Sequence, residues 1–160
     1  MKEIKIGFST SNALLSRFIR FVTRSSISHS YIRLPMITPG LDLIFQASGL
    51  LVNICGSKIF EGHAKIKEEM TFYVTDERFE NLELFMYSSL GKKYSLGQLI
   101  GMGWVLFCRS LHLNVKNPWR DNQHSYICVE LVATALGIPG SEEMTPQDLF
   151  DLLHNSQVVL

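Results

Sequence analysis

The chain has 160 residues, of which 46% are hydrophobic and 19% charged. This balance excludes a disordered protein and suits a single globular domain spanning residues 1–160. The formal net charge is zero, which argues against a general nucleic-acid binder, because such a protein needs a basic surplus to neutralise phosphates.

The cysteines and the apolar segments bear on where the protein works. Cys55, Cys108 and Cys128 show no regular spacing, so we expect no disulfide framework and a reducing compartment. No signal-like apolar run opens the chain, and the most apolar segment, residues 96–108, is shorter than the roughly 20 residues that span a bilayer. We therefore expect a cytoplasmic, soluble protein without a transmembrane segment, although export by another route stays open.

The first half of the chain predicts a sheet with one inserted helix. Alternating apolar and polar residues indicate a strand over residues 4–8. The helix that follows is expected to be capped within residues 9–12 and to carry Leu14, Leu15, Phe18, Ile19 and Val22 on one face. Further strands are expected at residues 29–34, 41–47, 50–54 and 70–74, with a turn at 38–40. Their short connections favour a mainly antiparallel sheet in an α+β fold.

A second face of the first helix is basic. Arg17, Arg20 and Arg24 recur on it at helical spacing. An ordinary solvated surface is the simpler interpretation. The alternative is peripheral contact with an anionic substrate or with a lipid surface.

The second half of the chain predicts mainly helices. Asp76 is the expected N-cap of one helix. An apolar helix over residues 94–108 follows, with Gly97 and Gly101 spaced for close packing, and we expect it to be a core element rather than a membrane hairpin. The final helix is expected to be capped at Thr145, and residues 157–160 are a candidate edge strand.

Residues 125–139 predict a helix with a cysteine in its opening turn. Ser125 is the expected N-cap, which makes Cys128 the third helical residue, and Gly137 suits the position just past the end. A thiol there feels the positive end of the helix dipole, which favours the nucleophilic thiolate. Free cysteines also commonly fill buried space, so a reactive role requires a base nearby.

His29 is the preferred base among the five histidines. It opens a predicted strand, which holds a side chain more rigidly than a loop does. Gln46, on the neighbouring strand, would accept the imidazole N–H through its amide oxygen and so orient the ring.

A zinc site is the main chemical rival. His124 and Cys128 stand four residues apart and would suit two ligands. Structural zinc usually takes four ligands with paired short spacings, and Cys55 and Cys108 stand alone. We therefore expect no metal and no cofactor.

Six segments, in this order along nearly the whole chain, resemble the permuted NlpC/P60 enzymes, also called permuted papain-fold amidases, of the YiiX/YaeF-like type. They are the opening strand at residues 4–8 with its helix, Ser28-His29, Phe45-Gln46-Ala47-Ser48-Gly49, Leu90-Gly91-Lys92-Lys93-Tyr94, Cys128-Val129-Glu130-Leu131-Val132 and Thr145-Pro146-Gln147-Asp148-Leu149. The resemblance implies a permuted papain-like fold with the cysteine helix packed on the face of a small sheet.

The same resemblance implies Cys128 as nucleophile, His29 as base and Gln46 as orienter. Three positions depart from the family pattern: Ile27 replaces a tyrosine thought to polarise the substrate carbonyl, Val129 replaces a serine, and Gln46 replaces an acid. Candidate oxyanion donors in place of the missing tyrosine are Tyr31 and Tyr126. Glu130 is a further candidate for positioning the substrate.

The sequence thus predicts a cysteine hydrolase that cleaves a peptide, isopeptide or other acyl bond through an acyl-enzyme. One alternative on the same scaffold is an acyltransferase or a lipid-directed thioesterase, which the three arginines and the apolar segment at residues 96–107 suggest. Another is a binding protein whose catalytic site has decayed, which Ile27 and Val129 suggest.

Overall fold

A computed structural model describes residues 1–36, 41–119, 125–141 and 144–155. In these ranges the strands are β1 (Lys2–Thr10), β2 (His29–Leu34), β3 (Leu43–Ser48), β4 (Leu51–Gly56), β5 (Lys65–Val74), β6 (Lys93–Tyr94) and β7 (Ser125–Tyr126). The helices are α1 (Leu14–Thr23), α2 (Ser57–Glu61), α3 (Asp76–Ser89), α4 (Leu96–Ser110), α5 (Cys128–Ala135) and α6 (Pro146–Asn155).

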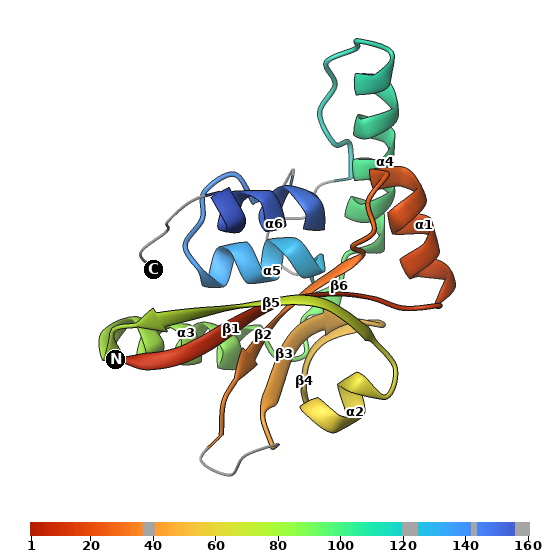
Figure 1. The fold of residues 1–160 in the computed structure, drawn as a ribbon. Coiled ribbons are helices and arrows are strands. Elements are labelled where there is room, and N and C mark those ends of the chain that lie inside the picture. The colour runs from red at the N-terminus through yellow and green to blue at the C-terminus, as the bar shows by residue number, and fades with distance from the viewer. Residues whose placement is uncertain (37–40, 120–124, 142–143, 156–160) are drawn as a thin grey trace.

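One curled sheet organises the molecule (Figure 1). Its strand order is β5-β1-β2-β3-β4-β6-β7, and every neighbouring pair is antiparallel except β6 and β7. The α+β class and the mainly antiparallel sheet are therefore confirmed. β2 lies between β1 and β3, and the residue that opens it, His29, pairs with Ser9 of β1.

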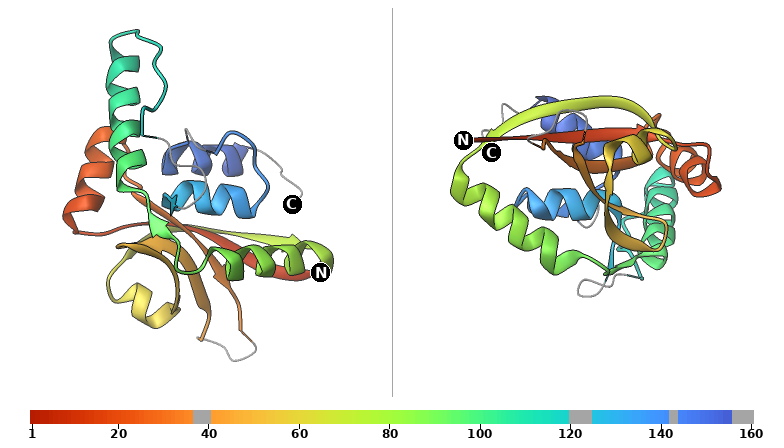
Figure 2. Two further views of the ribbon diagram at one scale, coloured as in Figure 1. Left: turned by 180° about the vertical axis from the view of Figure 1, so that it is seen from behind. Right: turned by 90° about the horizontal axis from the view of Figure 1, so that it is seen from below.

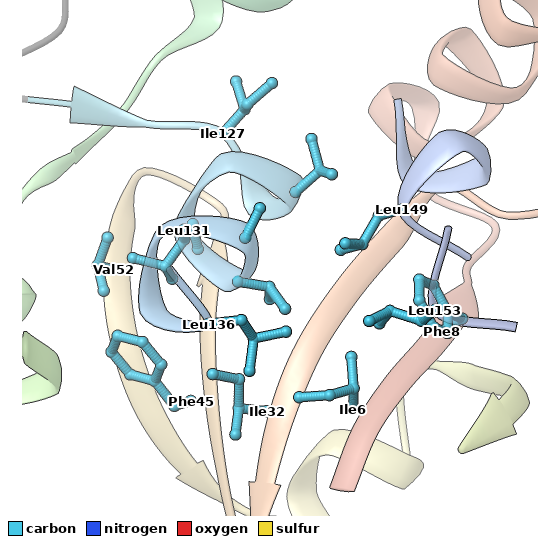
Figure 3. Close-up of a cluster of buried hydrophobic side chains, with 14 of the residues drawn as sticks. Ile6, Phe8, Ile32, Phe45, Val52, Ile127, Leu131, Leu136, Leu149 and Leu153 are labelled. Atoms are coloured by element: carbon cyan, nitrogen blue, oxygen red, sulfur yellow. The ribbon is translucent and has the colours of Figure 1, made fainter. Parts of the chain in front are cut away.

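Helices α5 and α6 cover one face of the sheet (Figure 2). α5 packs directly on β2 and β3, and α6 packs on α5. Figure 3 shows the core between these layers, which contains fully buried Ile6 and Ile32 from the sheet, Leu131 from α5 and Leu149 from α6. This packing presses the start of α5 against the central strands.

A smaller cluster lies on the opposite face of the sheet. Tyr31 and Ile44 are fully buried there against Phe60 of α2, and the Tyr31 and Phe60 rings lie 4.5 Å apart. Tyr31 also covers Gly7 of the neighbouring strand, where an added Cβ would overlap the tyrosine ring. The sheet is therefore packed on both faces near the start of β2.

The first four predicted strands correspond to observed ones, and β2 has the predicted bounds. The last predicted strand, residues 70–74, is longer in the structure, because β5 pairs with β1 along its whole length. The residues that open this edge strand are mostly polar, so the hydrophobic pattern of the sequence did not mark them as a strand. Helix α2 was not predicted. The expected turn at residues 38–40 and the edge strand at 157–160 lie outside the described residues.

Two predicted N-caps are wrong. Ser125 belongs to β7, which pairs in parallel with β6, so Ile127 becomes the N-cap of α5 and Cys128 its first residue. Thr75, and not Asp76, caps α3, because its hydroxyl accepts a hydrogen bond from the Arg78 N–H at 3.2 Å. Pairing between distant strands decides the N-cap of α5, and local geometry decides the N-cap of α3.

Two helices expose part of their apolar faces. On α1, Leu14 is 82% exposed and Phe18 is 43% exposed. On α4, buried Met102 and Val105 lie on one face and exposed Trp104 on another, so the helix is only partly a core element. None of the described helices is long and apolar enough to cross a bilayer.

Replacement of Gly7 tests the packing at the start of the sheet. Gly7→Ala should lower the free energy of unfolding by about 1–3 kcal/mol, because a methyl group at this position overpacks against the buried Tyr31 ring. Urea denaturation followed by circular dichroism measures the change.

The matched control is Gly97→Ala in α4. An alanine Cβ there would meet the Trp119 Cβ at an ordinary 3.7 Å, and alanine favours a helix over glycine, so stability should stay the same or rise. Equal stability losses in the two variants would contradict the overpacking at Gly7.

Candidate active site

A cluster of hydroxyl groups anchors the start of β2, where His29 lies. The Ser16 and Ser28 Oγ atoms are 2.6 Å apart, and Thr10 Oγ1 lies 3.3 Å from each. Ser16 belongs to α1, Ser28 immediately precedes β2 and Thr10 ends β1, and all three residues are buried. The cluster therefore joins three segments immediately beside His29 and restricts where its backbone lies.

Gln46 orients the imidazole. Its Oε1 lies 2.9 Å from His29 Nε2. The Gln46 Nε2 group donates to Asn53 Oδ1 and to Cys55 Sγ, each at 3.3 Å, and this arrangement turns the amide oxygen toward the histidine. In the neutral ring, Nε2 then carries the proton and Nδ1 keeps a free lone pair.

Cys128 begins α5 and is held against β2. Its sulfur accepts hydrogen bonds from the backbone N–H groups of Ser30, in β2, and of Val129, in the first turn of α5. The first N–H groups of a helix have no acceptor within the helix, so they stabilise a thiolate. The residue is only 3% exposed.

The His29 imidazole and the Cys128 thiol interact directly. Burial alone would lower the pKa of His29, but the hydrogen bond and the charge of Cys128, together with the Gln46 hydrogen bond, raise it above its usual value. Burial alone would raise the pKa of Cys128, but the hydrogen bond and charge of His29 and the two backbone donors lower it. The opposed shifts favour a thiolate–imidazolium pair.

Tyr94 is the site residue that the sequence analysis missed. Its phenol is buried and hydrogen-bonded to the Cys128 sulfur. Burial and the negative charge of Cys128 hold the pKa of Tyr94 well above its usual value, so the phenol keeps its proton and acts as a donor. Tyr94 ends the Leu90–Tyr94 segment, one of the six segments on which the resemblance to the permuted NlpC/P60 enzymes rests. This segment could have pointed to Tyr94, but no role was inferred for it.

The three other candidate residues do not meet the thiol. The Tyr31 hydroxyl, in the smaller cluster, donates a hydrogen bond of 2.7 Å to Glu69 Oε1. The Tyr126 ring packs on Phe85, with a centroid distance of 6.1 Å. Glu130 is buried in the first turn of α5, but it is not among the groups that shift the pKa of Cys128.

The other positions singled out in the sequence have separate places. Ile27, which replaces the family's tyrosine, is buried in the core. His124, the candidate zinc ligand, lies outside the described residues. Among the residues that the structure does describe, no group of three or more histidine, cysteine, aspartate or glutamate side chains is arranged to hold a metal ion.

A cavity of about 350 Å³ opens beside His29. His29, Gln46 and Tyr94 contribute its polar side, and its apolar walls include Leu15 and Ile19 of α1, Ala47 of β3 and Ile59 and Phe60 of α2. Cys128 is not among the residues that line the cavity, but His29, which interacts with its thiol, is.

Comparison with models of known protein families gives no match for this chain, and comparison with curated proteins gives none either.

The pH dependence of alkylation tests the thiolate. Cys128 should react with iodoacetamide with a midpoint below that of free cysteine, because His29 and the backbone donors lower its pKa. In His29→Ala the midpoint should move to higher pH. Peptide mass spectrometry measures each cysteine separately.

Cys55 is the internal control. Its pKa is raised by burial, a shift that the Gln46 hydrogen bond only partly opposes, so its midpoint should lie above that of free cysteine and hardly respond to His29→Ala. A Cys128 midpoint at or above that of Cys55 would count against a paired thiolate.

Proposed function

We propose that the protein is a cysteine hydrolase that cleaves an amide or acyl bond through an acyl-enzyme on Cys128. The observation that carries the proposal is the direct interaction of Cys128 with His29, whose other ring nitrogen is bound by Gln46. Nucleophile, base and orienter recur in this relation on unrelated folds. The proposal includes membership of the permuted papain-like NlpC/P60 enzymes, from which the same three residues were inferred.

In the first half of the reaction His29 takes the proton of Cys128 through Nδ1, and the thiolate attacks the substrate carbonyl. Negative charge then develops on the carbonyl oxygen. The buried Tyr94 phenol and the Val129 N–H both donate to the Cys128 sulfur in the free protein, and in this proposal they stabilise that charge. Tyr94 thereby supplies the side-chain donor that Ile27 lacks.

In the second half the tetrahedral intermediate collapses. The bond to the leaving amine, alcohol or thiol breaks, and the His29 imidazolium gives that group its proton. Neutral His29 then removes a proton from water, which attacks the thioester and releases the acid. The Gln46 Oε1 atom accepts a hydrogen bond from the Nε2–H group in every state of the ring, and a neutral orienter is sufficient because this bond needs no charge.

Transfer or hydrolysis of a lipid acyl chain is the second candidate function. The observation that favours it is the largely apolar cavity beside His29. Alkyl groups lose water-exposed surface when they bind such a wall, whereas a polar peptide would leave hydrogen bonds unmade there.

Esters of p-nitrophenol with acids of increasing length test both candidates. The protein should release a burst of p-nitrophenol and gain the mass of one acyl group, because the thioester on Cys128 forms before it is hydrolysed. Rapid-mix absorbance and intact-protein mass spectrometry measure these. Faster acylation by octanoate than by acetate would favour lipid acyl chains, and the reverse would favour small acyl groups or peptides.

Cys128→Ala should give neither burst nor added mass, and Cys55→Ser, at the cavity wall, should keep both. Full acylation of Cys128→Ala would refute the proposed nucleophile. A wild-type protein that reacts no faster than denatured protein would favour the decayed binding protein.

Replacement of Tyr94 separates its hydroxyl from its ring. Tyr94→Phe should slow acylation by about 10²–10³, the cost of one oxyanion donor, while the ring keeps its packing. Tyr126→Phe is the matched control and should stay near the wild-type rate, because its ring packs on Phe85. An unchanged rate in Tyr94→Phe would remove this residue from oxyanion stabilisation.

A further inference from the structure

Helices α1 and α4 each expose a row of large apolar side chains. On α1 these are Leu14, Phe18 and Phe21, and on α4 they are Ile100, Trp104 and Phe107. The spacing of three and four residues places each row on one face of its helix. Phe21 is 84% exposed and Trp104 is 49% exposed, although aromatic rings of this size usually bury most of their surface.

The two rows form one surface. The helices pack on each other at Val22 and Gly103, where a Cβ on Gly103 would lie 3.4 Å from Val22. Both helices run in the same direction, and the far end of α4 projects beyond the rest of the molecule (Figures 1 and 2). In two parallel helices the residues turn about the axis in the same sense. The apolar row of α1 is rotated backward from Val22 and the row of α4 is rotated forward from Gly103, so the two rows lie on the same side of the helix pair. We call the six residues of the two rows the α1–α4 face.

The charged residues of α1 and α4 themselves are all basic. Arg17 and Arg20 border the apolar row of α1 on the side away from α4, and Arg24 follows at the end of the helix. The sequence has no aspartate or glutamate at residues 4–41 or 84–120, which include both helices, although the whole chain is neutral. Within the described residues, none of the ion pairs involves Arg17, Arg20 or Arg24.

We propose that the α1–α4 face docks on the surface of an anionic phospholipid membrane. Exposed phenylalanine and tryptophan enter the boundary between headgroups and acyl chains, while flanking arginines pair with phosphate and serine headgroups. A second copy of the chain fits less well, because a symmetric interface would bring the same arginines together without a carboxylate from either helix to pair with them.

The position of α1 gives this docking a consequence for the site. Its Leu15 and Ile19 line the cavity beside His29 while Leu14, Phe18 and Phe21 face outward. One helix therefore separates the membrane from the cavity. The proposal does not depend on Cys128 chemistry, since docking requires only the outer face.

Vesicle co-sedimentation with the full chain tests the proposal. The protein should bind vesicles of phosphatidylcholine with 30% phosphatidylserine, bind vesicles of phosphatidylcholine alone far more weakly, and dissociate as salt is raised. Phe21→Ser/Trp104→Ser should abolish binding. Arg17→Glu/Arg24→Glu should weaken it by more than about tenfold, because each basic residue near an anionic surface contributes about fivefold in affinity.

Matched controls carry the same changes elsewhere. Tyr87→Ser on α3 removes an aromatic ring that is 71% exposed, and Lys65→Glu/Lys67→Glu reverses two exposed charges on β5. Both variants should bind vesicles like the wild type, as should Cys128→Ala, whatever its activity. Circular dichroism checks that every variant is folded.

Two results would overturn the proposal. One is a wild-type protein that does not bind the anionic vesicles, or that binds them equally well after the changes on α1 and α4. The other is a dimer in light scattering that Phe21→Ser/Trp104→Ser converts to a monomer, because the α1–α4 face would then be an interface between two copies.

Discussion

The contact between the Cys128 sulfur and the His29 imidazole is the interaction on which the proposed chemistry depends. A charge pair buried this deeply is costly, because both partners lose their hydration. Here the cost is offset by partners on every side: Gln46 accepts from the imidazole, and the N–H groups of Ser30 and Val129 donate to the sulfur. The pair is therefore held by backbone and side chains from β2, β3 and α5.

The fold supports this contact through its layers. α5 packs on β2 and β3, and α6 closes the core behind it, so α5 has little freedom to move its first residue away from the sheet. The β6–β7 pairing brings Tyr94 and the residues before Cys128 together at the edge of the same sheet. A hydroxyl donor and a thiol from separate parts of the chain thereby become neighbours.

The proposed membrane surface and the candidate site share α1. This helix follows β1 directly, and its Ser16 belongs to the hydroxyl cluster that anchors the start of β2. A force that holds α1 against a membrane would thus act next to the cavity wall and close to His29.

Local patterns in the sequence determined much of this structure. The strand predicted at residues 29–34 has the same bounds as β2. The Thr145 and Asp148 side chains and backbones bond reciprocally at the start of α6, because that motif needs only residues three apart. The order of Ser-His, Gln and Cys segments also led to His29, Gln46 and Cys128.

Tertiary structure decided the contacts between segments that are distant in the sequence. Pairing with β6 took Ser125 from the helix, pairing with β1 extended β5, and Tyr94 reached the sulfur. Periodicity placed Leu14 and Phe18 on the apolar face of their helix, but only the packing of the other elements decides whether that face is covered.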